Sequence, residues 1–149
     1  MRPTDLPAAG ERTRRARGNE LVECALIFPA LLALLLVVGE VAGAVATHQV
    51  LNNAAREGAR LAVVPGEYGL TAEVQNRVIA YAAANGVTLA ASNVTVDQNE
   101  VVNPGGGACG ASNPCIQASR VAVSYSYPLS TLLGAAMQLG AAVEMRNFY

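Results

Sequence analysis

The chain has 149 residues, of which 52% are apolar and 14% charged, and these values describe one small domain that is more apolar than an average soluble protein. Its positive charge is concentrated at the N-terminus, where residues 1–18 hold five of the ten basic residues but only two of the eleven acidic ones. Residues 19–149 therefore carry a formal charge of −4, and no basic surface for nucleic acid is predicted.

The N-terminal region places a small residue between a basic stretch and an apolar run. Four arginines between residues 12 and 17 precede Gly18, and an acid, Glu23, occupies the fifth position counted from Asn19. A secretory signal would be cut after its apolar core, whereas this order predicts a cut before the core, between Gly18 and Asn19. The pattern is typical of a type IV prepilin-like leader, so we expect residues 1–18 to be a cytoplasmic basic leader that is cleaved.

The apolar run covers residues 24–46, and as a helix these 23 residues would span about 34 Å, enough for a bilayer core of about 30 Å. Because excess positive charge stays on the cytoplasmic side, we expect the N-terminus inside a bacterial inner membrane and the C-terminal part in the periplasm. Pro29 favours a kink in this helix. Glu40 lies either near the outer headgroup boundary or in an intersubunit contact.

The helical pattern continues beyond the membrane, with apolar or small residues at helical spacing until Pro65 and Gly66 predict a stop. We expect one helix from about residue 20 to 63, so that residues 19–64 form a transmembrane and membrane-proximal segment. Four small residues on one face would let another backbone approach closely: Ala54, Ala55, Gly58 and Ala59. This face packs either against the protein's own head or against a partner helix.

Residues 65–149 are predicted to form a small α+β head in which one helix packs on an antiparallel sheet of about three strands. Thr71 is expected to cap a helix over residues 72–84, which ends before Gly86. Strands are expected at residues 93–97, 120–127 and 141–148, with a short helix or apolar loop at 130–138. The inward side chains of the last two strands are predicted to be Val121, Val123, Tyr125, Tyr127, Val143 and Met145.

The three cysteines are expected to have structural roles and no catalytic or metal-binding ones. Cys109 and Cys115 lie in a loop rich in glycine and proline, and in an oxidising compartment we predict a disulfide, worth about 2 kcal/mol in the chain-entropy model. Cys24 is expected to pack within the apolar run.

A metal site would need further ligands, and the single histidine, His48, lies far along the sequence with no evident partner in the head. We expect no catalytic residue, metal or cofactor.

Two segments together resemble a known family. Residues 17–29 (RGNELVECALIFP) with the apolar helix that follows, and residues 53–60 (NAAREGAR), are similar to the signature of the TadE-like family, the minor pseudopilins of the tight-adherence (Tad/Flp) pilus. Residues 125–129 and 143–146 resemble the family's C-terminal pattern more loosely. The sequence departs from the pattern at Cys24, where an aromatic residue is usual, and at Glu20, which adds a second acid.

The resemblance implies a minor pseudopilin of the inner membrane that a prepilin peptidase cuts after Gly18. Its other partners would be related minor pilins, the small Flp pilin, an inner-membrane assembly platform and membrane lipid. In this role the Glu23 carboxylate would pair with the new α-amine of Asn19, from its own or a neighbouring subunit. Glu20 is expected to be a solvated acid in the first helical turn.

Two other classes remain open. The chain could be a bitopic envelope protein whose periplasmic head binds a partner without entering a fibre. It could also be an enzyme with an uncharacterised head, although convergent polar residues are missing from the sequence.

Overall fold

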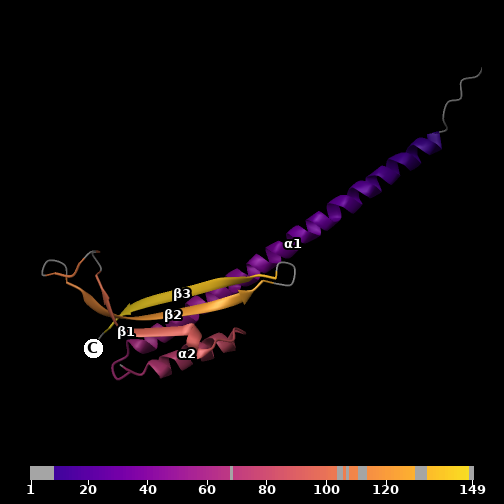
Figure 1. The fold of residues 1–149 in the computed structure, drawn as a ribbon. Helices are drawn as coiled ribbons and strands as arrows, with labels where there is room; N and C mark the ends of the chain where they lie inside the picture. The colour runs from indigo at the N-terminus through magenta and orange to yellow at the C-terminus, as the bar shows by residue number, and fades with distance from the viewer. Residues whose placement is uncertain are drawn as a thin grey trace, which may run out of the picture. The chain divides into compact units, whose positions relative to one another are not determined.

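The computed structural model describes residues 9–67, 69–103, 106, 108–110, 114–129 and 134–147, and side chains from residue 20 onward. Its elements in chain order are α1 (Ala9–Ala62), α2 (Thr71–Ala84), the short 3-10 helix η1 (Ala91–Asn93), β1 (Val94–Val102), β2 (Ile116–Pro128) and β3 (Ala136–Arg146) (Figure 1). The predicted α+β class is confirmed, with a long apolar N-terminal helix, a second helix and an antiparallel three-stranded sheet. The chain divides into two compact units, Met1–Val41 and Ala42–Tyr149.

The first unit is the N-terminal part of α1. The helix continues through Pro29, and the large apolar side chains between Leu21 and Val41 are all exposed. Side chains of this kind face water at a cost of about 25 cal/mol per Å² of apolar surface. The segment therefore needs an apolar environment that the chain itself does not supply.

The second unit contains the sheet, whose strand order is β1-β2-β3 with both pairs antiparallel. β2 and β3 pair without interruption from Ala118↔Arg146 to Pro128↔Ala136. β1 pairs with the first part of β2, and its register shifts between Asp97 and Glu100. β2 is thus the central strand, and it alternates as predicted between buried and more exposed side chains.

The core lies between one face of this sheet and two helices, the C-terminal part of α1 and α2 (Figure 1). The helices contribute small and aliphatic side chains that are fully buried: Leu51, Ala54, Ala55, Ala59 and Ala62 from α1, and Val74, Val78 and Ala82 from α2. The sheet contributes Val94, Val121, Val123, Leu139 and Ala141. Val143 and Met145 pack partly buried against this core, so their predicted inward orientation is confirmed.

Several predicted boundaries are wrong. α1 begins at Ala9 and not near residue 20, and β2 begins at Ile116, four residues before its predicted start. Thr71 does not cap α2: the N-cap is Leu70, which has no side-chain capping bond, and Thr71 lies in the first turn. β1 extends to Val102 because it continues past the polar residues of its register shift, where the sequence alternation is lost. β3 begins at Ala136 because pairing with the end of β2 extends it through a segment that is too small and apolar to predict a strand. Residues 130–133 and 148 lie outside the described residues.

Candidate functional site

The predicted processing and pairing residues lie on α1. Gly18 and Asn19 are within its helical backbone, and the side chains of Glu20 and Glu23 are exposed. Cys24, which follows directly, is exposed and carries a free thiol. An exposed carboxylate at the start of an apolar helix is available to a group from another subunit. Asn19 lies one turn before Glu23 in the helical backbone.

The apolar surface that follows this carboxylate has the length and composition of a membrane span. Among the described residues one helix, Glu20–Ala62, is long and apolar enough to cross a membrane, with a mean hydropathy of 2.7 in its best window and none of that window buried inside the structure. A helix that is apolar all round and left uncovered by its own chain is consistent with a single-pass membrane protein.

The small-residue face of α1 has its partner within the chain. Ala54, Ala55 and Ala59 are completely buried in the core of the second unit. A β-carbon added to Gly58 would overlap Cγ2 of Val78 and lie 3.4 Å from Cγ1 of Val121. Of the two partners considered for this face, the protein's own head is the one that occupies it.

His48 is a residue whose role the sequence did not indicate. Its Nε2 lies 3.1 Å from the carbonyl oxygen of Gly140 in β3, and its Nδ1 lies 3.1 Å from Nδ2 of Asn52. A neutral imidazole satisfies both contacts, since Nε2–H donates to the carbonyl and Nδ1 accepts from the amide. The expectation of no partner in the head is therefore wrong, because β3 runs back beside this turn of α1.

A charged surface lies on the outer side of α1 and α2. Arg77 Nη2 lies 2.5 Å from Oε1 of Glu57, and Arg77 Nε donates to the same oxygen at 3.2 Å. This hydrogen bond is the main cause that lowers the pKa of Glu57 below its ordinary value of 4.5. Arg60 adds a weaker attraction, and two shallow hollows of about 520 and 570 Å³ meet at Glu57 and Arg60.

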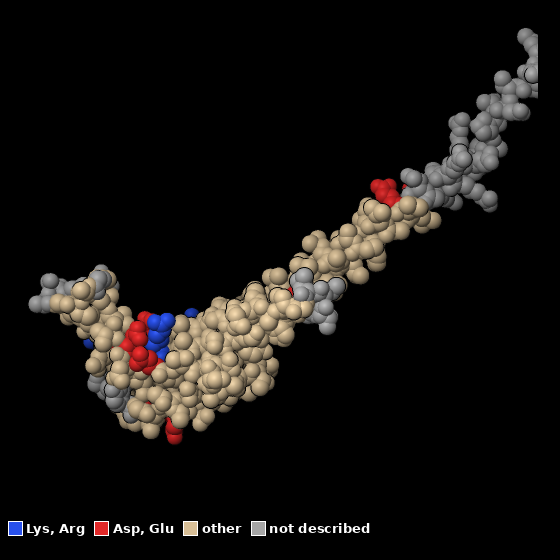
Figure 2. Space-filling model, in the orientation of Figure 1, with Lys and Arg blue, Asp and Glu red and all other residues tan. Residues whose placement is uncertain are grey.

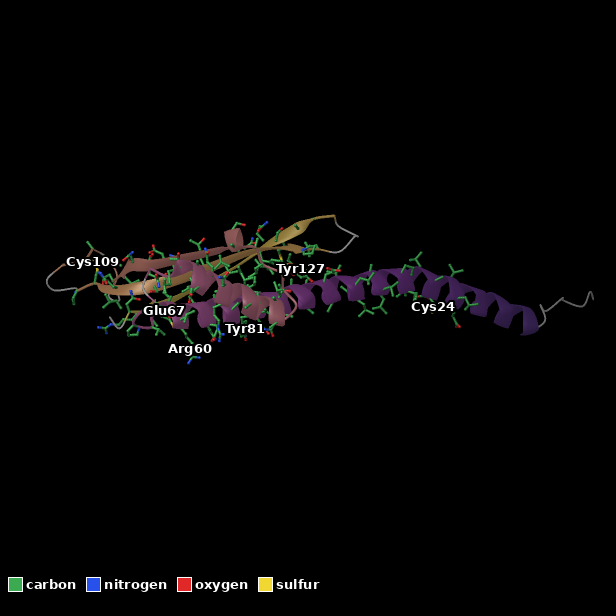
Figure 3. All side chains as sticks on the ribbon, turned by 90° about the horizontal axis from the view of Figure 1, so that it is seen from below. Cys24, Arg60, Glu67, Tyr81, Cys109 and Tyr127 are labelled. Carbon is green, nitrogen blue, oxygen red and sulfur yellow. A yellow bond between two sulfur atoms is a disulfide. The ribbon has the colours of Figure 1, made fainter. Side chains whose placement is uncertain are left out.

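The two loop cysteines lie at one end of the sheet. Cys109 and Cys115 are joined by a disulfide, with their Cα atoms 5.5 Å apart. Figure 3 shows Cys109 at one end of the sheet and Tyr127 at the other. Formation of this bond in the cell remains a prediction, as does the free state of Cys24.

Among the described residues no cluster of three His, Cys, Asp or Glu side chains could hold a metal ion.

A buried polar cluster joins the end of α1 to the sheet, and sequence reasoning missed it. Gln98 Nε2 donates to the carbonyls of Ala62 and Glu67 at 3.2 and 3.0 Å, and Gln98 Oε1 accepts from Gly69 N at 2.7 Å. Ser119 Oγ donates to Asn147 Oδ1 at 2.7 Å. The last carbonyls of a helix have no hydrogen-bond partner within the helix and need partners of this kind. The cluster therefore caps the C-terminus of α1.

The cluster's only sequence signal is the position of Ser119. It stands two residues before Val121 and so shares the inward face of β2. Asn147 completes the cluster by donating from Nδ2 to the carbonyl oxygen of Gln98 at 3.0 Å.

The comparison with known proteins gives a match in the N-terminal part of the chain. Residues 18–60 match the sequence model of a family described as TadE-like protein. No curated protein matches the chain, and no solved structure matches it. The TadE-like family suggests a pilin-like protein associated with the Tad pilus, and its members are generally structural and not enzymatic. The matched residues begin at Gly18 and end two residues before the end of α1. The chain thus contains a TadE-like domain at residues 18–60.

Proposed function

We propose that the chain is a minor pseudopilin that takes part in the assembly of a Tad/Flp-type adhesive pilus. The observation that carries the proposal is the coincidence of three features in one segment: the family match over residues 18–60, the acid at Glu23, and an apolar helix that the rest of the chain leaves uncovered. In this proposal α1 spans the inner membrane with its N-terminus in the cytoplasm, and residues 65–149 form the periplasmic head.

Processing is the second part of the proposal. A prepilin peptidase cuts after Gly18, which leaves Asn19 with a free α-amine four residues before Glu23. A carboxylate and an ammonium group at the edge of an apolar phase are each costly alone and favourable as a pair. Glu23 therefore sets the register of this subunit against its neighbours during fibre assembly, and it takes no part in catalysis.

The partners follow from this role. They are the prepilin peptidase, the other minor pilins, the Flp pilin and an inner-membrane assembly platform. The exposed span contacts membrane lipid before assembly, and apolar pilin helices replace that lipid if the subunit enters the fibre. A bitopic anchor whose head binds a periplasmic partner is the alternative, and it needs no carboxylate at position 23.

The experiment that tests the proposal compares Glu23→Ala with Glu20→Ala in a strain that lacks the wild-type copy. Both changes make the start of the span more apolar, so insertion should be at least as good in either variant. We expect Glu23→Ala protein to accumulate at normal levels in the membrane while piliation falls sharply, and Glu20→Ala to have a weaker effect. Normal piliation with Glu23→Ala would contradict the pairing and favour the anchor.

A further inference from the structure

β2 lies lengthwise along α1, in the opposite direction. At one end Ser119 Oγ lies 3.4 Å from the carbonyl oxygen of Ala62. Further along, Val121 lies against Gly58, as described above. At the far end the Tyr127 hydroxyl lies 2.5 Å from the position of a β-carbon on Gly43. The eight residue-to-residue steps from 119 to 127 and the nineteen from 43 to 62 cover similar lengths, about 26 and 28 Å.

This alignment brings the β2–β3 end of the sheet to the level of the membrane boundary. Gly43 belongs to the apolar run of residues 24–46, and it lies only three residues, about 4–5 Å along the helix, before the end of that run. A strand that reaches Gly43 therefore reaches the outer edge of the bilayer core, if α1 spans the membrane as proposed.

The described strand residues at this end carry no charge, and the nearest acid on α1 is Glu40, three residues before Gly43. Between Arg120 and Glu144 the sequence has no acidic or basic residue. The polar residues on the outer face of these strands, such as Ser124 and Ser126, are uncharged. Pro128, Ala136 and Met137 are exposed there, and Tyr127 is half-buried with its hydroxyl toward α1. Exposed apolar side chains beside a tyrosine are the composition found at membrane interfaces.

The charges of the head gather at the other end. Arg120 lies 3.4 Å from Glu144 and 3.8 Å from Glu100, measured between the charged nitrogen and oxygen atoms. On the face in view, Figure 2 shows red and blue side chains toward this end of the head and uncharged residues toward the β2–β3 end. A charged group at the bilayer interface loses hydration, so this separation of charge fits a head with one end against lipid.

We propose that the β2–β3 end of the sheet, formed by Tyr127, Pro128, Leu129, Ala135, Ala136 and Met137, contacts the outer lipid interface beside α1. This lipid-facing end fixes the orientation of the head on the membrane. The disulfide loop at the opposite end is then directed away from the bilayer. The inference rests on the proposed membrane span, and its test separates the two.

The experiment uses the absence of tryptophan from the chain, which makes each introduced tryptophan a unique probe. The full chain is reconstituted in two sets of phosphatidylcholine vesicles, one with acyl chains brominated near the headgroups and one with acyl chains brominated near their ends, and quenching of tryptophan emission in each is compared with that in unbrominated vesicles. Met137→Trp and Ala136→Trp report on the proposed lipid contact. Leu35→Trp, 60% exposed within the span, and Val101→Trp, 59% exposed near the other end of the sheet, are the controls.

We expect tryptophan at positions 137 and 136 to lose most of its emission with bromines near the headgroups, tryptophan at position 35 to lose most of its emission with bromines near the chain ends, and tryptophan at position 101 to keep its emission in both. Quenching at position 35 alone would overturn the lipid contact and leave the membrane span intact. A blue-shifted but unquenched emission at positions 136 and 137 would also overturn it, because a second protein copy would then cover this end. Absence of quenching at position 35 would overturn both proposals.

Discussion

Gly58 of α1 and Val78 of α2 lie in direct contact at the centre of the core. Any β-carbon on Gly58 would overlap Cγ2 of Val78, and Val74 Cγ1 would lie 3.6 Å away. Val78 is completely buried. The two helices can approach this closely only because position 58 has no side chain, so the glycine sets the distance between them.

Gly58→Ala is expected to destabilise the head. Overpacking a tight core costs about 1–3 kcal/mol, and the gain in helix propensity offsets only about 0.5–1 kcal/mol of that. Thermal unfolding of the full chain in detergent measures the loss. Gly39→Ala is the matched control on the same helix, since a β-carbon there meets nothing within 4 Å. Equal unfolding temperatures for the two variants would contradict the close contact.

Ser119→Ala should lower the free energy of unfolding by about 1–3 kcal/mol, because it leaves the buried Asn147 Oδ1 without the hydrogen bond from Ser119. Denaturant unfolding in detergent checks this value. Ser124→Ala in the same strand is the control, since Ser124 is exposed. If both serine variants unfold alike, the buried cluster contributes nothing to the attachment of α1.

The pair of Glu57 and Arg77 should stabilise the head in a pH-dependent way. The side chains are 28% and 58% exposed, so the contribution is small, about 0.2–1 kcal/mol. Because the folded-state pKa of Glu57 is lowered, the stabilisation is complete above pH 4.5 and is lost as the pH falls through the lowered pKa. Glu57→Gln should therefore unfold earlier than wild type at pH 7 and equally at low pH.

A double-mutant cycle with Arg77→Gln isolates the coupling between the two side chains. A coupling that persists below the folded-state pKa would contradict the ion pair as its source.

The mature protein is expected to begin at Asn19. N-terminal analysis of protein purified from its native membrane tests this, and Gly18→Leu should leave the leader attached because a bulky side chain replaces the small one before the cut. Gly10→Leu, which changes a glycine within the leader, should be processed normally. Native protein that still carries the arginines of residues 12–17 would contradict the prepilin interpretation.

Peptide mapping under non-reducing conditions should find Cys109 linked to Cys115 and Cys24 free. The expectation depends on the head lying in an oxidising compartment. Free thiols at both loop positions in protein taken from the envelope would argue against the periplasmic orientation.

Elements whose pattern is local were predictable from the sequence. The long helix follows from its apolar run and the Pro65–Gly66 stop, and β2 follows from the strict alternation of Val121 and Val123 with smaller residues. Gly86, with a φ of +80°, ends α2 as predicted.

Features that depend on residues distant in the sequence were not predictable. The start of β3 is decided by its pairing with β2, and no local pattern of residues 136–140 indicates a strand. The sequence does not indicate the hydrogen-bond partners of His48 and Gln98, because Gly140 and Ala62 come close to them only in the folded chain. The proposed role of Glu23 depends on other subunits, because the group that would pair with it comes from a processed N-terminus.

The lengthwise alignment of β2 with α1 has a mechanical consequence. A force applied along the helix axis, such as the one that lifts a subunit from the bilayer, would act on the contacts at Ala62, Gly58 and Gly43 in shear and at the same time. Contacts loaded in parallel share the force, whereas contacts that peel apart one after another fail singly. The part of α1 from Ala42 to Ala62 would therefore carry the sheet with it.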